Sequence, residues 1–331
     1  MVAERKIMKA WRIENLKDVK LEESVLQRKP GEVKVKLAKV AMSSTDLAFF
    51  ADEKHTFYIP GHSAVAHVSE SDEDSGLKLG SRVVLSPYLS VTEHGAECIK
   101  TMGVDVDGML QDFACVPQEN AFVLPDGITD EEAIFAEYIA MGNKVFESID
   151  SEKGDYIVIV GASTLGLILG QLATYYQMVP ILVDMDSAKL ELAAKWDIYY
   201  TLNPTYDDLE RKVEQITGGR MSEVAIIAGK SVPLNMALRL VKNEGQIILA
   251  GYILKAKQPV DTDIILKKQL VMHGVCNGDG EMSSAINLLA NKVIHTEGLI
   301  SNEIDFEEFP KFVDECVKYP HKFNKVIVNF D

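Results

Sequence analysis

The sequence predicts an α/β protein in which a β-rich first domain precedes a doubly wound parallel sheet. The chain has 331 residues, which is more than one small core needs and fits two domains. Up to about residue 123, short β-type runs alternate with turns. From about residue 154, apolar β-type runs alternate with segments of helical pattern, which is the order that builds a parallel sheet.

The first part of the chain contains short runs of β-forming residues. In the run from 32 to 40, apolar residues at positions 33, 35 and 37 alternate with lysines at 34 and 36. This period of two indicates a half-exposed strand of an antiparallel barrel or sandwich. The runs that we expect to form strands are 9–13, 32–40, 64–69, 82–85 and 111–116.

A helix is predicted to follow this β-rich part. Thr129 is a suitable N-cap residue, and Glu132 follows it three positions later. That spacing is typical of a capping box, in which each side chain bonds the backbone N–H of the other residue. We expect the helix to continue to about Ile149 and to lead into the second domain.

The most informative stretch of the chain runs from Gly154 to Asp186. An apolar strand at 156–160 is followed by a turn, a helical segment to about residue 177, and a strand at 181–183 that ends on Asp184. This is the order of a dinucleotide-binding βαβ unit, whose glycines let the backbone approach a pyrophosphate at the helix N-terminus. Glycine-rich turns are common in α/β proteins, so the glycines alone do not establish this function.

The turn departs from the usual G-x-G-x-x-G pattern. Its three positions are Gly161, Ser163 and Gly166, so that a serine replaces the middle glycine. Ser163 still has a backbone N–H and a hydroxyl that it could offer to a phosphate. Its Cβ limits how closely the turn can approach the ligand.

Asp184 distinguishes the two nicotinamide dinucleotides, because it lies some 20 residues past the turn, at the end of a strand. A carboxylate there accepts both ribose hydroxyls of NAD and repels the 2′-phosphate of NADP, so the sequence favours NAD. Lys189 could accept that phosphate, whereas Asp186 would repel it.

After Asp184 the alternation continues and brings the predicted sheet to six strands. The expected helices are 188–195, 206–216 and 233–241, and the expected strands are 199–202, 224–227, 246–249 and 270–274. A ligand of such a sheet crosses the carboxyl ends of its strands. The predicted cofactor residues are therefore Gly161, Ser163, Thr164, Leu165, Asp184, Lys189, Ala228, Gly251 and Cys276, with Gly229, Tyr252 and Val275 beside them. A helix at 280–290 and a strand at 325–328 would return the chain to its first domain.

Composition and charge exclude several classes of partner. The formal net charge is −16, which disfavours nucleic acid and anionic membranes as partners. No apolar run approaches the ~18–20 residues of a membrane span, and the N-terminus lacks the apolar core of a signal peptide. We therefore expect a soluble cytoplasmic protein. Its four cysteines contain no C-x-x-C pair, which argues against a disulfide framework or an obvious zinc cluster.

A series of short motifs follows the chain in a fixed order. They are Ser43-Ser-Thr-Asp46 (family form C-G-[ST]-D), Gly61-His62-Ser63 (G-H-E), Leu79-Gly-Ser-Arg-Val83 (V-G-D-R-V), Asp107–Phe113 (G-G-F-A-E-Y), Leu124-Pro-Asp-Gly127, Glu137-Tyr-Ile139 (E-P-L), the nucleotide turn, and the segments 237–241 and 244–248. In their order, they resemble the medium-chain dehydrogenase/reductase superfamily, the zinc alcohol and polyol dehydrogenases, over nearly the whole chain.

The resemblance implies a fold, a reaction and an assembly. It implies a GroES-like catalytic domain at 1–143, completed by 278–331, and a Rossmann NAD-binding domain at 144–277. The implied reaction is hydride transfer between an alcohol or carbonyl and a nicotinamide. The implied assembly is a homodimer or homotetramer.

The chain departs from the superfamily at the positions that hold zinc. There the resemblance places Ser43, His62 and Glu137, and Ser63 replaces the glutamate of G-H-E. A serine hydroxyl is a poor zinc ligand, so a catalytic zinc is in doubt. It stays open whether another residue, such as Asp46 or Cys115, completes a metal site. Between Pro87 and Asp107, where the family's four-cysteine lobe would lie, only Cys98 is present, and we expect the structural zinc to be absent.

The resemblance also suggests catalytic residues, each with an alternative role. Thr45 would relay the proton of the substrate hydroxyl. His62 would ligate a residual metal or donate to a substrate oxygen, or would be a packing histidine. Glu137 would orient or polarise that oxygen, or would form a salt bridge with Lys144. Asp46 would support the site or cap a turn, and His55 would line the pocket or, as we favour, lie on the surface.

Three functions follow from these residues. The leading hypothesis is an NAD(H)-dependent oxidoreductase of the alcohol dehydrogenase type, acting on a secondary alcohol or ketone of a small polyol, sugar or cyclitol. The second is a zinc-free quinone or enone reductase. The third, of another class, is a catalytically inactive nucleotide-binding sensor or structural protein.

Overall fold

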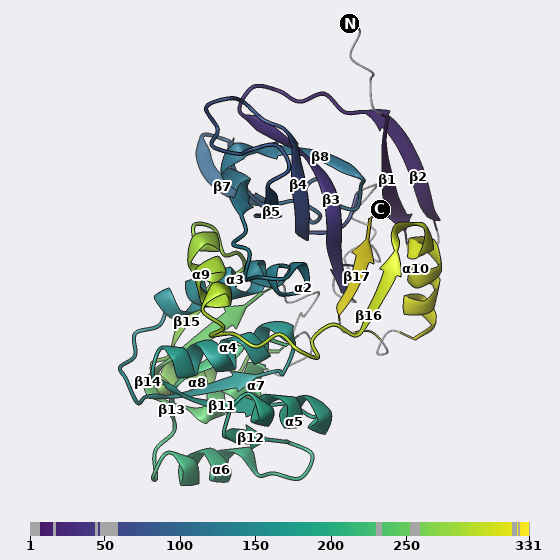
Figure 1. Ribbon diagram of the computed structural model, residues 1–331. Helices are drawn as coiled ribbons and strands as arrows, with labels where there is room; N and C mark the ends of the chain where they lie inside the picture. The colour runs from purple at the N-terminus through teal and green to yellow at the C-terminus, as the bar shows by residue number, and fades with distance from the viewer. Residues whose placement is uncertain are drawn as a thin grey trace, which may run out of the picture. The chain divides into compact units, whose positions relative to one another are not determined.

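The computed structural model describes residues 7–15, 18–43, 46, 59–229, 234–251, 259–319, 323 and 325–330 (Figure 1). The chain forms two compact units. The first contains Met1–Glu137 and Thr296–Asp331, and the second contains Tyr138–His295.

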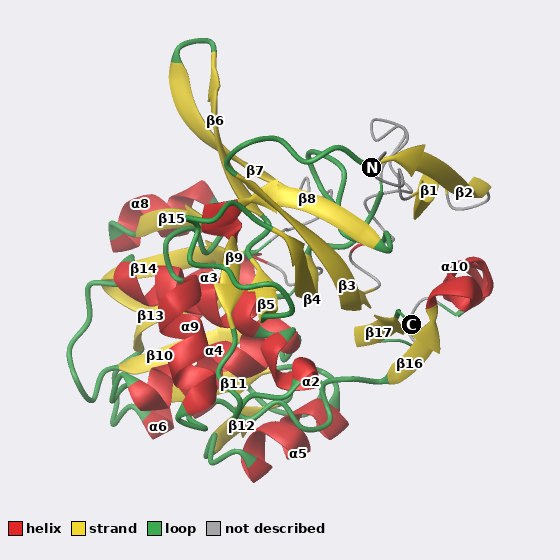
Figure 2. Ribbon diagram, turned by 45° about the horizontal axis from the view of Figure 1, so that its top comes forward, coloured by secondary structure: helices red, strands yellow, loops and turns green. Residues whose placement is uncertain are grey.

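The first unit is rich in β-structure, as the sequence predicted. Among its described residues, seven strands form one sheet, in the order β16 (Asn302–Asp305), β17 (Lys325–Asn329), β3 (Glu32–Ser43), β4 (Ser63–Glu70), β5 (Arg82–Leu85) and β9 (Ala121–Val123), with β8 (Phe113–Pro117) also paired to β3. The pairs β1 (Ile7–Asn15) with β2 (Asp18–Val25) and β6 (Tyr88–Glu93) with β7 (Ala96–Thr101) form antiparallel ribbons, the second of which is extended in Figure 2. The chain returns to this unit at Thr296, and η2 (Phe306–Glu308) and α10 (Phe309–Lys318) lie between β16 and β17 in the sequence.

The alternating pattern of β3 is only partly the expected one. Val33, Val35 and Leu37 are buried and Lys36 is exposed, as predicted. Lys34 is buried, however, because its ammonium lies 3.1 Å from Glu70 Oε1 and covers an aromatic ring of β8. The charge of Lys34 is therefore paired with that of Glu70, on the face of β3 that we expected to be exposed to solvent.

The predicted helix after residue 129 is present, but it is interrupted. Thr129 Oγ1 accepts a hydrogen bond from the N–H of Glu132, and Glu132 Oε2 accepts one from the N–H of Thr129, which confirms the capping box. The helix α2 (Asp130–Ala133) is short, and a second helix, α3 (Ala136–Glu147), follows it. The new start places Glu137 in the first turn of α3.

The second unit contains the predicted parallel sheet. Within the described residues its six strands run in the order β12 (Tyr200–Leu202), β11 (Val179–Val183), β10 (Tyr156–Val160), β13 (Ser222–Ile227), β14 (Val241–Ala250) and β15 (Val271–Val275). Every pair is parallel, and the strand order reverses beside β10, as in a Rossmann fold. Helices flank the sheet (Figure 2): α4 (Thr164–Tyr175), α5 (Ser187–Lys195), α6 (Leu209–Ile216), α7 (Leu234–Leu240), α8 (Thr262–Lys268) and α9 (Met282–Ala290).

Two boundaries in the second unit differ from the prediction for local reasons. Helix α6 begins three residues late, because Asp208 is its N-cap and accepts a hydrogen bond from the N–H of Arg211. Strand β14 begins at Val241 rather than at residue 246, because α7 already ends at Leu240.

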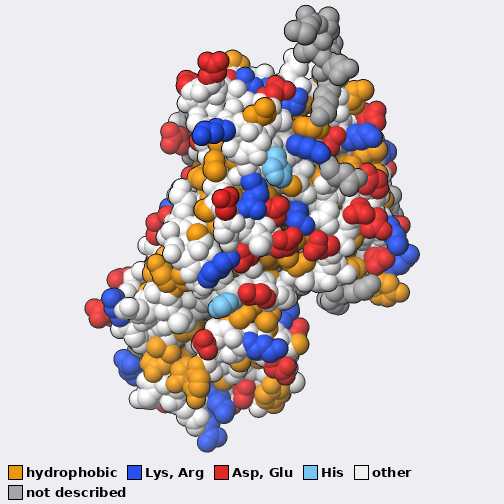
Figure 3. Space-filling view, viewed as in Figure 1, with side chains coloured by type: hydrophobic (Ala, Val, Ile, Leu, Met, Phe, Trp, Pro, Cys, Tyr) orange, Lys and Arg blue, Asp and Glu red, His pale blue; other side chains and the backbone are white. Residues whose placement is uncertain are grey.

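The surface carries charges of both signs. On the face drawn in Figure 3, lysine and arginine side chains are interspersed with aspartate and glutamate. Among the described residues, no helix combines the length and apolar character that a membrane span needs.

Candidate active site

The nucleotide turn of the second unit requires glycine at two of its positions. Gly161 has a φ of +107°, and a Cβ there would lie 2.7 Å from the backbone nitrogen of Gly229. A Cβ on Gly166 would overlap the carbonyl oxygen of Gly161. The turn is thus packed tightly against the end of β13, which explains the glycines that the sequence singled out.

Ser163 caps the helix that follows the turn. Its hydroxyl accepts a hydrogen bond from the N–H of Gly166 at 3.2 Å and donates one to the carbonyl of Ala228 at 2.6 Å. The hydroxyl proton therefore points to the backbone, in contrast to our expectation that it could serve a phosphate. Thr164 and Leu165 begin α4 and are buried. The partial positive charge of this helix N-terminus is still suited to an anion.

Asp184 is held in place by the turn that it faces. Its Oδ2 accepts a hydrogen bond from the N–H of Ala162 at 2.6 Å, and its Oδ1 accepts one from the N–H of Asp186 at 2.8 Å. Each carboxylate oxygen can accept a second hydrogen bond, and the side chain is partly exposed. Lys189, one turn into α5, has its ammonium 3.9 Å from Asp186 Oδ2.

The other predicted cofactor residues follow neighbouring strands. Ala228, Gly251 and Cys276 come after β13, β14 and β15, at the edge of the sheet that also carries Asp184. Gly251 has a φ of +79°, and its N–H donates to the carbonyl of Val275 at 2.8 Å. Cys276 is exposed. Tyr252 lies outside the described residues.

The first unit contains a buried polar cluster, by which we mean Asp46, His62, Ser63, Tyr88, Glu137 and Lys325. Each of these residues is buried, with exposed fractions between 0% for Lys325 and 7% for His62. They come from β4 and the residue before it, from β6, α3 and β17, and from the segment after β3. Six polar residues at one buried place need mutual partners.

His62 and Glu137 lie at the centre of this cluster. His62 Nδ1 is 2.6 Å from Asp46 Oδ1, and His62 Nε2 is 3.7 Å from Glu137 Oε2. Glu137 accepts a hydrogen bond from the hydroxyl of Tyr88 at 2.8 Å and another from that of Ser63 at 3.0 Å.

The alternative pairing of Glu137 with Lys144 is wrong. Lys144 pairs with Glu147 at 3.0 Å, one turn along α3, whereas Glu137 faces the hydroxyls of Tyr88 and Ser63. Two further alternatives gave His62 only a packing role and Asp46 only a turn-capping role. Neither accounts for the short distance between His62 Nδ1 and Asp46 Oδ1.

Lys325 enters the cluster through the pairing of β17 with β3. It lies opposite Ser43 across β3 and β17, while Ser63 lies opposite Ala41 on the other side of β3. Burial lowers the pKa of Lys325, against the opposing effect of the carboxylates of Asp46 and Glu137. Burial also acts to lower the pKa of His62, but the same two carboxylates outweigh it and raise that pKa above its ordinary value.

Several predicted residues are not placed. Thr45 and His55 lie outside the described residues, as does the side chain of Ser43. Two members of the cluster were missed from the sequence, Tyr88 and Lys325. Tyr88 had no motif around it, and a lysine at the start of a strand usually faces solvent. Lys325 becomes recognisable as a member of the cluster only from its position opposite Ser43.

The family's zinc positions fall partly outside the described residues, because the side chain of Ser43 is not among them. In the part of the chain that the structure describes, no group of three His, Cys, Asp or Glu side chains has an arrangement that could hold a metal. Cys98, on β7, has its Sγ 3.9 Å from Glu93 Oε2.

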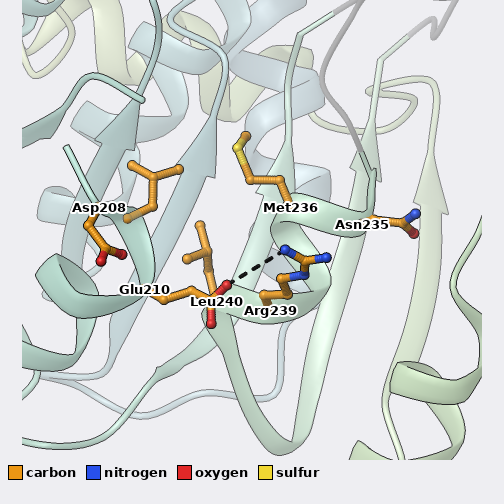
Figure 4. Close-up of a pocket in the computed structure, with 7 residues that line it drawn as sticks. Asp208, Glu210, Asn235, Met236, Arg239 and Leu240 are labelled. Carbon is orange, nitrogen blue, oxygen red and sulfur yellow. Dashed lines mark ion pairs between the residues drawn. The ribbon is translucent and has the colours of Figure 1, made fainter. Parts of the chain in front are cut away.

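A separate groove of about 330 Å³ lies between α6 and α7 (Figure 4). Arg239 and Glu210 form an ion pair across it at 3.9 Å. None of its lining residues belongs to the nucleotide turn, to the predicted cofactor residues or to the buried polar cluster, so we assign it no part in the chemistry.

Two family models match the chain. Residues 29–126 match the alcohol dehydrogenase GroES-like domain, and residues 164–291 match the zinc-binding dehydrogenase model. These ranges fall within the first and second units, respectively.

Known proteins match over nearly the full length. An uncharacterized zinc-type alcohol dehydrogenase-like protein of Haemophilus influenzae is 27% identical, over 91% of this chain and 92% of its own. Sorbitol dehydrogenase of Bacillus subtilis is 23% identical over 97% of each chain. A short chain alcohol dehydrogenase of Escherichia coli CFT073, solved with NADH, superposes with a TM-score of 0.85 at 22% identity, covering 98% of this chain and 99% of its own. The chain therefore belongs to the medium-chain dehydrogenase/reductase superfamily, where it is an oxidoreductase of the zinc-type alcohol dehydrogenase family.

Proposed function

We propose that the protein is an NAD(H)-dependent oxidoreductase that moves a hydride between C4 of the nicotinamide and the secondary alcohol carbon of a small polyol, sugar or cyclitol. The observation that carries the cofactor choice is the fixed, partly exposed carboxylate of Asp184. The choice of a polyol rests on the relationship to sorbitol dehydrogenase.

The preference for NAD over NADP follows from charge. Asp184 would accept both ribose hydroxyls and would repel a 2′-phosphate. Lys189, which could otherwise attract that phosphate, is close to Asp186. Asp186 thus adds a second negative charge on the same side.

In the oxidation direction, the carbinol carbon gives its hydride to the nicotinamide, and the hydroxyl gives its proton to the protein. We assign the orientation of the substrate oxygen to His62 and Glu137, and the relay of the proton to Thr45, whose role rests on the resemblance. Asp46 would fix the orientation of the His62 ring, since it contacts Nδ1 and leaves Nε2 for the substrate.

The cofactor choice can be tested by binding alone, through fluorescence titration with NADH and NADPH. The wild-type protein should bind NADH more tightly, and Asp184→Asn should lose roughly 10- to 100-fold in affinity for NADH, as expected for lost charge-assisted hydrogen bonds. Asp186→Asn is the matched control, because it removes the same charge two residues away. Equal losses in both variants would argue against a ribose contact by Asp184.

We also propose a cytoplasmic homodimer or homotetramer. Strand β15 lies at the edge of its sheet, and Val271 on it is 47% exposed, which suits coverage by a second copy. Light scattering after gel filtration should give a mass of two or four chains, and a single-chain mass would contradict the assembly.

A further inference from the structure

One of the two hydrogen bonds that hold the Asp184 carboxylate comes from the peptide group between Met185 and Asp186. The N–H of this peptide group donates to Asp184 Oδ1 at 2.8 Å, and its carbonyl accepts a hydrogen bond from Asn203 Nδ2 at 2.9 Å. In a planar trans peptide the carbonyl and the N–H point in opposite directions, so fixing one end also fixes the other. Asn203 therefore determines the direction of the N–H that holds the carboxylate.

Asn203 is brought beside this loop by the pairing of two parallel strands. In the register of β11 with β12, Val183 lies opposite Leu202. The N–H of Asp184 donates to the carbonyl of Leu202 at 3.2 Å, which continues the pairing by one residue. Asn203 follows β12 at the same edge of the sheet and is only 2% exposed, so its side-chain amide needs partners within the protein.

The amide of Asn203 is oriented by the turn that it begins. Its Oδ1 accepts a hydrogen bond from the N–H of Thr205 at 3.0 Å, in the local pattern of an Asx turn. The Nδ2 group then faces the loop, where it donates to the carbonyl of Met185 and to Ser187 Oγ at 3.2 Å. Both N–H bonds of Nδ2 are thus used, one on each side of Asp186.

Only one orientation of this amide satisfies its partners. The N–H of Thr205 can only donate, and the carbonyl of Met185 can only accept. Without the Nδ2 donor, the carbonyl of Met185 would be free to turn toward Asp184, and a carbonyl oxygen repels a carboxylate. The bond from the N–H of Ala162 would then be the remaining one of the two that hold the carboxylate.

We infer that Asn203 is a positioning residue for the cofactor: by fixing the peptide group between Met185 and Asp186, it keeps the Asp184 carboxylate in the orientation that selects NAD over NADP. The inference rests on the proposed function, in which Asp184 binds the adenosine ribose. Asn203 acts through the geometry of Asp184 and not through charge, because its side chain is neutral.

The first test requires no cofactor. Amide hydrogen exchange of the nucleotide-free protein, followed by NMR, should be slow at Asp186 and about tenfold faster or more in Asn203→Ala, because the N–H loses its fixed orientation. Asn143→Ala is the matched control in the same unit. Asn143 is 1% exposed and donates to Ser284 Oγ at 2.9 Å, so the same kind of buried bond is removed elsewhere. Exchange at Asp186 that stays unchanged in Asn203→Ala would overturn the inference, whether or not the protein binds NADH.

The second test is a double-mutant cycle on NADH affinity with Asn203→Ala, Asp184→Asn and the double variant. Asn203→Ala should weaken NADH binding about tenfold and change NADPH binding little, because the lost geometry serves the ribose hydroxyls. In the Asp184→Asn background, the same substitution should cost less than about twofold. Equal losses in both backgrounds, or equal losses for NADH and NADPH, would reduce Asn203 to a structural residue.

Ser187→Ala keeps both tests decisive if Asn203→Ala does not fold. Ser187 is exposed, and its substitution removes one of the two acceptors of Asn203 Nδ2. We expect changes in the same direction, with a loss of about two- to threefold in NADH affinity. A wild-type protein that binds no NADH would contradict the proposed function. A wild type that binds NADH, with exchange and affinity unchanged in every variant of Asn203 and Ser187 that folds, would contradict the inference alone.

Discussion

Glu137 is a residue whose partners in the structure differ from those that its sequence neighbours offer. From the sequence, its nearest candidate partner was Lys144, seven residues along the predicted helix. In the structure, its partners come from β4 and β6, which lie 74 and 49 positions earlier in the chain. A motif can point to a functional carboxylate, but the hydroxyls that hold it depend on strand pairing, which no local pattern reveals.

Tyr88 is expected to stabilise this carboxylate. Tyr88→Phe removes a hydrogen bond to a buried, charged oxygen, and should lower the free energy of unfolding by about 1–3 kcal/mol in denaturant titrations. The matched control is Tyr206→Phe, since Tyr206 is 71% exposed. If the two variants were equally stable, the hydrogen bond from Tyr88 would make no net contribution to the free energy of unfolding.

The cysteines should differ in reactivity. Burial raises the pKa of Cys115 to about 11, so its thiol stays protonated and unreactive at mildly alkaline pH. Cys276 is exposed, so a thiol reagent should label it first, and Cys276→Ser should remove the fast phase. Bound NADH should slow that phase if Cys276 contacts the cofactor. Unchanged labelling in saturating NADH would remove Cys276 from the predicted cofactor site.

At the scale of elements, the helix α4 and the turn before it are determined by sequence to an unusual degree. The glycines and the acid at the end of β11 are local features, and the structure contains each where the pattern placed it. The N-cap role of Ser163 was not predicted. The hairpin of β6 and β7 was not predicted. Its turn places His94 and Gly95 at positive φ, and its strands carry many partly exposed polar residues, so no clear alternation marks it.

Gly166 is the sharpest test of the turn. Alanine in a helix is ordinarily more favourable than glycine by about 1 kcal/mol. Here the added Cβ would overlap the carbonyl oxygen of Gly161, so Gly166→Ala should instead destabilise the protein by about 1–3 kcal/mol and weaken NADH binding. Gly127→Ala serves as the control, because its Cβ would meet open space. A stabilised Gly166→Ala would show that the turn is not tightly packed at this position.

At the scale of the whole molecule, the sequence predicts both the β-rich unit and the parallel sheet with its helices. It does so because apolar residues recur at a different spacing in each of the two units. Six parallel strands in the order of a Rossmann fold, and a β-rich unit completed by the C-terminal strand β17, are both present. The chemistry of the first unit could be predicted only in part. His62 and Glu137 belong to motifs, whereas Lys325 joins them from the far end of the chain and becomes recognisable only once β17 pairs with β3.

The most direct measurement is the formation of NADH from NAD and a panel of secondary alcohols, polyols and cyclitols, followed by absorbance before and after treatment with a chelator. We predict turnover with at least one polyol and a preference for NAD over NADP. Turnover that the chelator abolishes and zinc restores would place His62 and Glu137 in a metal site, whereas turnover indifferent to the chelator would identify a zinc-free dehydrogenase. Absence of turnover with every alcohol, together with reduction of enones or with tight NADH binding alone, would contradict the proposed function.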